Sequence, residues 1–288
     1  VEWGGAANLW EAGTGQRIGP PMLHEGGVRV ARFSPDGRHL ATASWDATVR
    51  FWHPETARRL PPLLRHGGFV TALAFSPDST RLLTGSQDTA VRLWRLATNR
   101  PARLELRHGG TVFRTRHDPA GTRIVTAGED GTARVWDRVS GERRLTLHHA
   151  GPVTEACYSP DGRHILTAST DGTARPWDAA TGQPVFPGAP HGDPVMPAAF
   201  SPDGRRFLTL GGPAVRVWQT ADGAPVAAPL DRGSPPSCAA FNPDGTRVVT
   251  GHDDGMAQVW SLAGGQPDGP RLEVGGQVRA AVFSPDGR

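Results

Sequence analysis

Hydrophobic and polar residues alternate with a period of two in short segments of this chain, and turn residues separate the segments. Residues 66–107 show the pattern clearly: 70–75 (VTALAF), 81–84 (RLLT), 91–94 (VRLW) and 104–106 (LEL) each alternate, and the sequence Ser-Pro-Asp-Ser separates the first two. Alternation of this kind is typical of half-buried β-strands, and the separating sequence is typical of a tight turn. The pattern therefore predicts four short antiparallel strands within these residues.

This four-strand unit recurs along the whole chain. Two markers repeat every 41 or 42 residues: a tryptophan, and a turn that begins at Phe33 with the sequence FSPDG. The tryptophans are Trp10, Trp52, Trp94, Trp136, Trp177, Trp218 and Trp260, and the later turns begin at Phe75, His117, Tyr158, Phe200, Phe241 and Phe283. A fixed period of this length indicates a solenoid, a propeller or an array, and four antiparallel strands per period indicate a β-propeller blade.

Proline and glycine mark the end of each repeat. Prolines gather in the fourth strand, for example Pro61 and Pro62, and proline cannot donate to an inner ladder. We therefore expect the fourth strand to be the outer edge of its sheet. The turn after the tryptophan carries a residue suited to a positive φ in six of seven repeats, with Ala57 as the exception. These six residues are Gly15, Asn99, Gly141, Gly182, Gly223 and Gly265.

The repeats resemble those of the WD40 family. The resemblance rests on residues 131–137 (GTARVWD) and on 66–68 (HGG) ahead of a strand, and it extends over the whole chain. It implies an all-β fold, a seven-bladed β-propeller of four-stranded antiparallel blades. It also implies a structural tetrad in each blade: a His before the first strand, a Ser or Thr and an Asp around the second turn, and the Trp.

Three repeats match this tetrad completely. The matching residues are His24, Ser44, Asp46 and Trp52; His66, Ser86, Asp88 and Trp94; and His149, Ser169, Asp171 and Trp177. The other three complete repeats depart from it: Gly128 replaces the Ser in the third, Gly212 replaces the Asp in the fifth, and Arg232 replaces the His in the sixth. We expect these departures to affect the rigidity of their blades and not the fold.

We expect residues 1–288 to form a single propeller, with one blade split between the two ends of the chain. The expected blades are 24–65, 66–107, 108–148, 149–190, 191–231 and 232–273, with a last blade made of 274–288 and 1–23. Residues matching 39–42 are missing from the last blade, so it should lack its second strand. Because the chain starts without Met and stops within a repeat, we expect a piece of a larger protein. An array of more than seven blades is the alternative.

Composition and charge limit the classes of partner. The formal charge is +3, and the 31 basic residues, all of them Arg, are spread evenly along the chain, so neither nucleic acid nor a membrane is an expected partner. The chain has no apolar run long enough to span a membrane and no signal peptide at its N-terminus, so we expect a cytoplasmic protein. The two cysteines, Cys157 and Cys238, are interpreted as small buried apolar residues in a reducing compartment.

The recurring histidines and aspartates are interpreted as structural residues, and no enzymatic activity, metal site or cofactor is expected. The chain contains no HExxH, Cys-x-x-Cys, Gly-x-Ser-x-Gly or phosphate-binding loop sequence. The alternative is a small-ligand-binding or enzymatic propeller that uses the central channel. Such a site needs polar groups on the innermost strands, where the sequence places 72–74 (ALA), 156–157 (AC) and 198–199 (AA).

Five residues are candidates for a partner-binding site: Trp3, Arg29, Trp45, Phe69 and Phe113. Trp3 and Trp45 occupy one repeat position in adjacent blades, and the resemblance implies that this position and the loop before the first strand share a rim. Large aromatic residues and arginine carry most of the energy of protein interfaces. The alternative is that Trp3 packs on the chain terminus and Trp45 on a neighbouring blade.

The sequence as a whole favours a non-enzymatic scaffold that binds a protein or peptide. The Arg-rich repeats look like bacterial propellers fused to serine/threonine kinase or NTPase signalling domains. That resemblance implies a monomeric propeller within a larger bacterial signalling protein. A propeller with no fixed partner is the remaining alternative, and it would show uniform loops.

Overall fold

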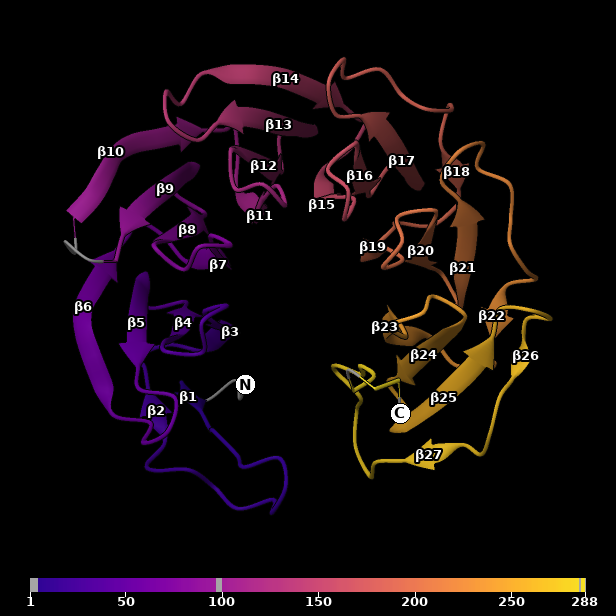
Figure 1. Ribbon diagram of the computed structural model, residues 1–288, viewed down its shortest axis with the longest axis horizontal. Helices are drawn as coiled ribbons and strands as arrows, with labels where there is room; N and C mark the ends of the chain where they lie inside the picture. Colours follow the sequence, from indigo (N-terminus) through magenta and orange to yellow (C-terminus); the bar gives the residue numbers. More distant parts are fainter. Residues whose placement is uncertain (1–4, 97–99, 285, 288) are drawn as a thin grey trace. The chain divides into compact units, whose positions relative to one another are not determined.

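The computed structural model describes residues 5–96, 100–284 and 286–287, with 100–103 described by their backbone alone (Figure 1). Within these ranges the regular structure consists of strands, and no helix is present. The chain forms two compact units, residues 1–146 and 147–288. Four-stranded antiparallel sheets, as predicted, are the main component of both units.

The first unit holds three four-stranded sheets, which we call blades 1 to 3, and one two-stranded sheet. In Figure 1 their first strands β3, β7 and β11 lie on one side of the unit and their fourth strands β6, β10 and β14 on the other. The small sheet consists of β1 (Ala6–Ala7) and β2 (Met22–Leu23). The blades are β3 (Val28–Phe33), β4 (Leu40–Ser44), β5 (Thr48–Trp52) and β6 (Arg59–Arg65); β7 (Val70–Phe75), β8 (Arg81–Ser86), β9 (Ala90–Arg95) and β10 (Arg100–Arg107); and β11 (Val112–His117), β12 (Arg123–Gly128), β13 (Thr132–Asp137) and β14 (Arg143–His148).

The second unit repeats this arrangement in blades 4 to 6. The inner strands are again first in each blade, and the outer strands are short. The blades are β15 (Val153–Tyr158), β16 (His164–Ser169), β17 (Thr173–Asp178) and β18 (Ala189–Pro190); β19 (Ala198–Phe200), β20 (Arg206–Gly211), β21 (Ala214–Gln219) and β22 (Leu230–Asp231); and β23 (Pro236–Phe241), β24 (Arg247–His252), β25 (Met256–Ser261), β26 (Gln266–Pro267) and β27 (Leu272–Glu273).

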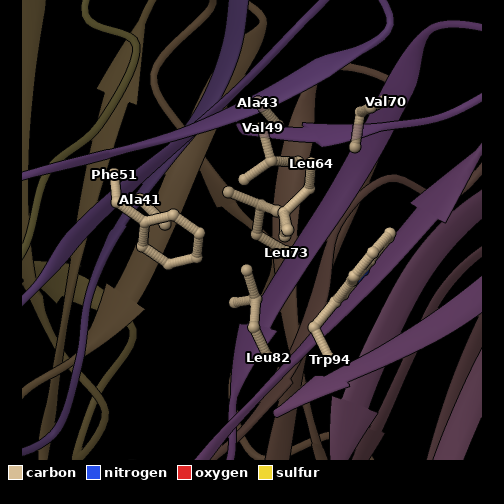
Figure 2. Close-up of a cluster of buried hydrophobic side chains, with 9 residues drawn as sticks. All are labelled: Ala41, Ala43, Val49, Phe51, Leu64, Val70, Leu73, Leu82 and Trp94. Carbon is tan, nitrogen blue, oxygen red and sulfur yellow. The ribbon is translucent and has the colours of Figure 1, made fainter. Parts of the chain in front are cut away.

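The hydrophobic core lies between successive blades. Figure 2 shows one such cluster, in which side chains from blade 1 meet Leu73, Leu82 and Trp94 of blade 2. Phe51 and Leu82 are almost completely buried there. The period-two alternation explains this packing, because each strand presents its apolar residues to a neighbouring sheet on one face or the other. The repeating tryptophan fills the space that the smaller strand residues leave between sheets.

A hydroxyl group on the inner strand joins neighbouring blades in the second unit. Thr154 Oγ1, in β15, lies 3.2 Å from the carbonyl oxygen of Ala168 in its own blade and 2.8 Å from that of Val195 ahead of β19. Ser237 makes the equivalent pair of contacts, to Gly251 and to Val278. In the first unit Thr71 does the same from blade 2 to blade 3. A side-chain donor thus fixes the register of one blade against the next.

The proline and turn predictions are confirmed in detail. The proline-containing strand β6 pairs only with β5, so it is the edge of its sheet. The predicted glycines have positive φ, and Ala57 adopts the same conformation with a φ of 53°. Ala57 is therefore held in the left-handed region, where a Cβ atom is unfavourable. Asn99, the remaining predicted residue, lies outside the described residues.

The two ends of the chain contain little regular structure. The pairing of β1 with β2 agrees with the expected third and fourth strands of the split blade. Among the described residues after Glu273, none belongs to a strand. The assembly of these two segments into one blade stays a prediction.

The cysteine prediction was wrong in part. Cys157 and Cys238 are both free thiols, but each is half-buried instead of buried. Burial raises the pKa of the Cys238 thiol, which favours its neutral form. The inner strands on which both residues lie are more open than the sequence pattern indicates, because the first strand of a blade has a neighbouring strand on only one side.

Candidate functional site

A threonine hydroxyl lies at the centre of the hydrogen-bond network in blade 1. Thr42, in β4, is completely buried. Its Oγ1 lies 2.7 Å from Trp52 Nε1 and 2.7 Å from His24 Nε2. The other ring nitrogen of His24, Nδ1, lies 3.0 Å from Asp46 Oδ2. One hydroxyl therefore links the third strand to the loop before the first strand.

The chemistry of each group assigns the donors in this network. An indole N–H can only donate, so Thr42 accepts from Trp52, and a carboxylate can only accept, so His24 donates from Nδ1 to Asp46. A neutral imidazole then has its lone pair on Nε2, and the Thr42 hydroxyl donates its proton there. The chain of donors runs from Trp to Thr to His to Asp, and each group has a partner.

The same network is present in blades 3 and 4. In each, the threonine Oγ1 lies within 2.6–2.9 Å of both the tryptophan Nε1 and the histidine Nε2. The residues are Thr126, His108, Asp130 and Trp136 in blade 3, and Thr167, His149, Asp171 and Trp177 in blade 4. Burial lowers the pKa of the histidine in both blades, although the hydrogen bond that the histidine donates to the aspartate opposes this effect.

Hydrogen bonds hold the pKa of the network aspartates low. Burial alone would raise the pKa of Asp130, but hydrogen bonds from the Thr132 hydroxyl and from the Gly109 amide lower it to about 2. The pKa values of Asp88 and Asp171 are likewise lowered to about 2, against the effect of burial. These carboxylates are therefore ionised acceptors at neutral pH, which suits a structural role and not proton transfer.

In blade 2 an arginine changes the network. Arg92 Nη1 is hydrogen-bonded to His66 Nδ1 and lies 2.6 Å from Asp88 Oδ2. Because the guanidinium can only donate, Nδ1 of His66 accepts, and the ring proton is on Nε2, which lies 2.6 Å from Thr84 Oγ1. Burial first, and then the positive charge of Arg92, lower the pKa of His66 to about 4.

The structure corrects the assignment of the Ser position. Ser44, Ser86 and Ser169 contact neither the His nor the Trp of their blades; Ser44 Oγ, for example, donates to the Gly26 carbonyl and accepts from the Asp46 amide. The linking hydroxyl belongs to the Thr two residues earlier. This Thr occurs in all six complete repeats, and that recurrence is the signal the sequence analysis missed. The residues are Thr42, Thr84, Thr126, Thr167, Thr209 and Thr250.

The network of the third repeat is complete although the repeat lacks the Ser. Gly128 occupies the Ser place, and Thr126 supplies the central hydroxyl. A Cβ atom at Gly128 would lie 2.3 Å from His108 Nδ1, so glycine leaves room for the histidine in this blade. The effect of this departure on the rigidity of the blade stays a prediction.

The second turn of blade 5 is one residue shorter than in the other blades. Trp218 follows Thr209 by nine positions, whereas in the other blades the Trp follows the Thr by ten, so no residue stands in the Asp place. Gly212 adopts a φ of +64° within this turn. His191 keeps its contact with Thr209 at 2.6 Å, but its Nδ1 has no hydrogen-bond partner among the described residues. Burial and the charge of Arg216 lower the pKa of His191 to about 4.

We expect Gly212→Ala to lower the free energy of unfolding by about 2 kcal/mol. The positive φ disfavours a Cβ atom, and that atom would lie 2.5 Å from Asp193 Oδ2. Gly204→Ala is the matched control, because Gly204 has a φ of +71° in the same blade but only an ordinary contact, 3.5 Å from Pro160. Urea denaturation measures both variants. Equal losses would show that the Asp193 contact adds nothing to the backbone strain.

In blade 6 the imidazole comes from a strand and not from the loop before the first strand. Arg232 replaces the usual histidine and pairs with Asp254. His252, at the end of β24, takes its place: its Nε2 lies 2.9 Å from Thr250 Oγ1, and its Nδ1 donates to the Ser234 carbonyl at 2.8 Å. Trp260 Nε1 donates to the same Thr250 hydroxyl. The sequence shows the loss of the histidine at position 232, whereas its replacement by His252 becomes visible only in the structure.

The structure places two of the candidate partner-binding residues in direct contact. The rings of Trp45 and Phe69 stack with centroids 6.0 Å apart and an interplanar angle of 28°. Trp45 follows β4 of blade 1, and Phe69 precedes β7 of blade 2. The Phe69 side chain is 43% exposed, whereas Trp45 is half-buried. This stacked pair lies beside the histidine and aspartate positions of its two blades.

The other candidates lie on inner strands or outside the described residues. Arg29, in β3, is exposed, and Phe113, in β11, is half-buried. No direct contact joins either of them to the stacked pair among the described ring contacts and ion pairs. Trp3 lies outside the described residues. The part of the chain that the structure covers contains no group of three or more His, Cys, Asp or Glu side chains that could hold a metal ion.

Comparison with known proteins decides the family. The model of the WD domain, G-beta repeat, matches residues 22–53, 60–95, 103–137, 141–178 and 232–261. The chain belongs to the WD40 family. Its fold is that of an all-β WD40 propeller of about seven blades, as the sequence predicts. The family match leaves out the whole fifth repeat, residues 191–231, where the structure shows the shortened turn.

A solved structure supports the WD40 fold. A computationally designed protein named Ika8 is similar over 98% of this chain and 86% of its own, with a TM-score of 0.86 and 24% sequence identity. A search of curated proteins found no significant match. WD40 propellers commonly mediate protein interactions and are typically not enzymes. The described residues contain no helix long and apolar enough to cross a membrane.

Proposed function

We propose that this WD40 propeller is a non-enzymatic scaffold that binds a protein or peptide through the stacked pair of Trp45 and Phe69. The observation that supports the proposal is the stacking of these two rings across adjacent blades, with Phe69 left 43% exposed. A tryptophan and a phenylalanine held in one orientation offer a large apolar surface that loses little conformational entropy on binding. Such residues are typical interface hot spots.

The Thr-centred hydrogen-bond networks support a binding role and not a catalytic one. The histidines and aspartates that recur in the repeats are committed to the Thr-centred networks of blades 1, 3 and 4. Catalytic acids and bases instead converge on one pocket with different environments. The loops that the networks hold rigid, including that of Asp46 next to Trp45, then provide a stable frame for a partner.

Arg29 and Phe113 are proposed as secondary contacts. Arg29 is exposed at the start of β3, near the loop that contains His24, and Phe113 starts β11 in the equivalent place of blade 3. An exposed arginine at an interface adds hydrogen bonds and apolar contact together. Trp3 shares the repeat position of Trp45 and stays part of the proposal on sequence grounds alone.

We expect Trp45→Ala to weaken partner binding by roughly thirtyfold, which corresponds to about 2 kcal/mol, with little change in stability. Peptides selected from a displayed random library against the parent protein serve as the probe. Each selected peptide is titrated against the parent, Trp45→Ala and Phe69→Ala, and a thermal melt is recorded for each protein. Gln87→Ala is the matched control, because exposed Gln87 holds the position of Trp45 in blade 2.

Two results would contradict this proposal. If the melting temperature of Trp45→Ala falls while its affinity per folded molecule is unchanged, Trp45 is a packing residue. If Gln87→Ala loses as much affinity as Trp45→Ala, the aromatic pair is not the hot spot of the peptide site, because the neighbouring polar side chain contributes equally. Loss of affinity in both aromatic variants, with the control unchanged, supports the site.

We also propose that the propeller is the cytoplasmic, monomeric recognition part of a larger bacterial signalling protein. The proposal rests on the similarity of its Arg-rich repeats to propellers fused to kinase or NTPase domains. Sequencing the gene on both sides of this segment tests it. A kinase or NTPase sequence in the same reading frame supports the proposal, and a stop codon on both sides of the segment contradicts it.

A further inference from the structure

Three departures from the repeat meet in one place between blades 2 and 3. Arg95 follows Trp94, where the third and fourth repeats carry Asp137 and Asp178. His117 ends β11, where five other repeats carry Phe and one carries Tyr. Arg138 takes a position that is Leu or Ala in repeats 2, 4 and 6, namely Leu96, Ala179 and Leu262. The fold needs none of these three residues, because the other blades form without them.

Strand pairing and charge bring these residues together with Arg81. Arg81 and Arg95 are directly opposite each other on β8 and β9. Arg138 and Arg95 both lie near enough to Arg81 to lower its pKa, after the larger effect of burial. Like charges in directly opposite strand positions destabilise a sheet. Blades 3 and 4 place Arg123 and His164 opposite an aspartate instead.

The imidazole of His117 lies within the same group of charges and lacks partners. Neither Nδ1 nor Nε2 of His117 has a hydrogen bond, and both atoms are buried. Arg138 Nε is also buried without a partner. Buried polar atoms without hydrogen bonds are unfavourable, and in native proteins they usually contact a water molecule or a bound ligand. Burial, followed by the charge of Arg138, lowers the pKa of His117 to about 4, so the ring is neutral at pH 7.

The nearby carboxylates neutralise this cluster only in part. None of the ion pairs found among the described residues involves Arg81, Arg95 or Arg138. The charge of Asp78 acts on Arg81 and on Arg138, and the charges of Asp78 and Asp118 oppose the lowering of the His117 pKa. The Asp78 carboxylate accepts from Ser76 and Thr80, and that of Asp118 accepts from Thr122 and from the Arg123 amide. Three guanidinium groups therefore face two carboxylates, which leaves one positive charge in excess.

We propose that Arg81, Arg95, Arg138 and His117 form a binding site for a phosphate group. Guanidinium groups bind phosphate through paired N–H donors, and a neutral imidazole N–H adds one more. A dianionic phosphate would relieve the repulsion between the three arginines and supply acceptors to the orphaned nitrogens of His117 and Arg138. The site is built from the turn ends of blades 2 and 3, and it is separate from the stacked pair of Trp45 and Phe69.

The test is calorimetric titration of inorganic phosphate into the whole protein at pH 7 and constant ionic strength. We expect Arg81→Gln to weaken phosphate binding by at least about tenfold. Arg206→Gln is the matched control and should bind like the parent. Arg206 starts β20 as Arg81 starts β8, but its opposite residue is Gln219.

A second variant keeps the test valid if Arg81→Gln folds poorly. Arg95→Asp restores the residue type of the third and fourth repeats and places an acid opposite Arg81. We expect it to raise the melting temperature in phosphate-free buffer and to abolish phosphate binding. A general loss of structure would lower both the melting temperature and the phosphate affinity. It therefore cannot produce a higher melting temperature together with a loss of phosphate binding.

The outcomes separate the possible sources of the phosphate. A phosphoserine peptide that binds about tenfold tighter than inorganic phosphate assigns the site to a modified protein side chain, and equal affinities assign it to free phosphate. Both outcomes support the proposal. The proposal is overturned if neither probe gives a heat of binding. It is also overturned if Arg95→Asp binds phosphate like the parent, or if Arg206→Gln loses as much affinity as Arg81→Gln.

Discussion

Replacing Thr167 with valine is expected to lower the free energy of unfolding by about 3 kcal/mol. The Thr167 hydroxyl is completely buried and lies 2.7 Å from both Trp177 Nε1 and His149 Nε2. Valine has nearly the same shape and suits a strand equally well, so the packing and the backbone are preserved. The loss comes from two buried polar groups left without partners. Urea denaturation followed by tryptophan fluorescence measures it.

Ser169→Ala is the matched control for this variant. Ser169 is just as buried and lies two residues further along the same strand, but its Oγ contacts only the Gly151 carbonyl and the Asp171 amide. We expect it to lose about 1 kcal/mol. If Ser169→Ala loses as much as Thr167→Val, the serine is equally important and the Thr-centred description of the network is incorrect.

Acidification from pH 7 to pH 5 should destabilise the protein through its buried histidines. Burial lowers the pKa of His66 and His117 to about 4, whereas in the unfolded chain both titrate near 6.5. Between these values the unfolded state binds more protons than the folded state. Stability is therefore complete above pH 6.5 and falls as the pH decreases toward 4. Each of these two histidines should contribute a loss of roughly 2 kcal/mol at pH 5.

His117→Phe isolates one part of this pH dependence. Phenylalanine is the residue of five other repeats at this position, and it removes the two orphaned nitrogens of His117. We expect the variant to be more stable than the parent at pH 7 and to lose roughly 2 kcal/mol less on going to pH 5. Urea denaturation at both pH values is the measurement. A variant with the same loss as the parent would show that His117 does not remain neutral in the folded state.

The aspartates do not contribute to the loss in this pH range. The pKa values of Asp88, Asp130 and Asp171 are held at about 2 in the folded state, against an ordinary value of 3.8. Their stabilising effect is present above pH 3.8 and is lost only as the pH falls further toward 2. The histidine and aspartate contributions are thus separated on the pH axis.

The sequence predicts the blades well because their signals are local. Alternation at 70–75 and the proline content of 59–65 depend on neighbouring residues alone, and the 41- or 42-residue spacing of tryptophan can be counted directly along the chain. The central threonine was missed because a buried threonine within a strand looks like any β-branched residue. Only its recurrence at Thr42 and the five equivalent positions marks it as a separate feature.

Other parts of the site depend on contacts that the repeat pattern does not encode. His252 replaces the missing histidine of blade 6 from β24, the strand that also carries Thr250, and the expected tetrad does not include this position. Arg81, Arg95 and His117 lie in two repeats, and only the packing of blade 2 on blade 3 brings them together. Counting back from Trp218 puts Gly212 in the Asp place, whereas counting forward from Thr209 shows a one-residue deletion, and the hydrogen bond between Thr209 and Trp218 shows that the second count is correct.

The network of blade 6 has a consequence for how such repeats diverge. Thr250 receives its imidazole from His252, so the loop position usually occupied by histidine is available for Arg232. In the other blades this loop position must be histidine because the network needs its imidazole. In blade 6 the position can vary, and the Thr250 hydroxyl keeps both of its partners. Moving a framework histidine from loop to strand thus enlarges the set of surface sequences that selection can explore while the fold is retained.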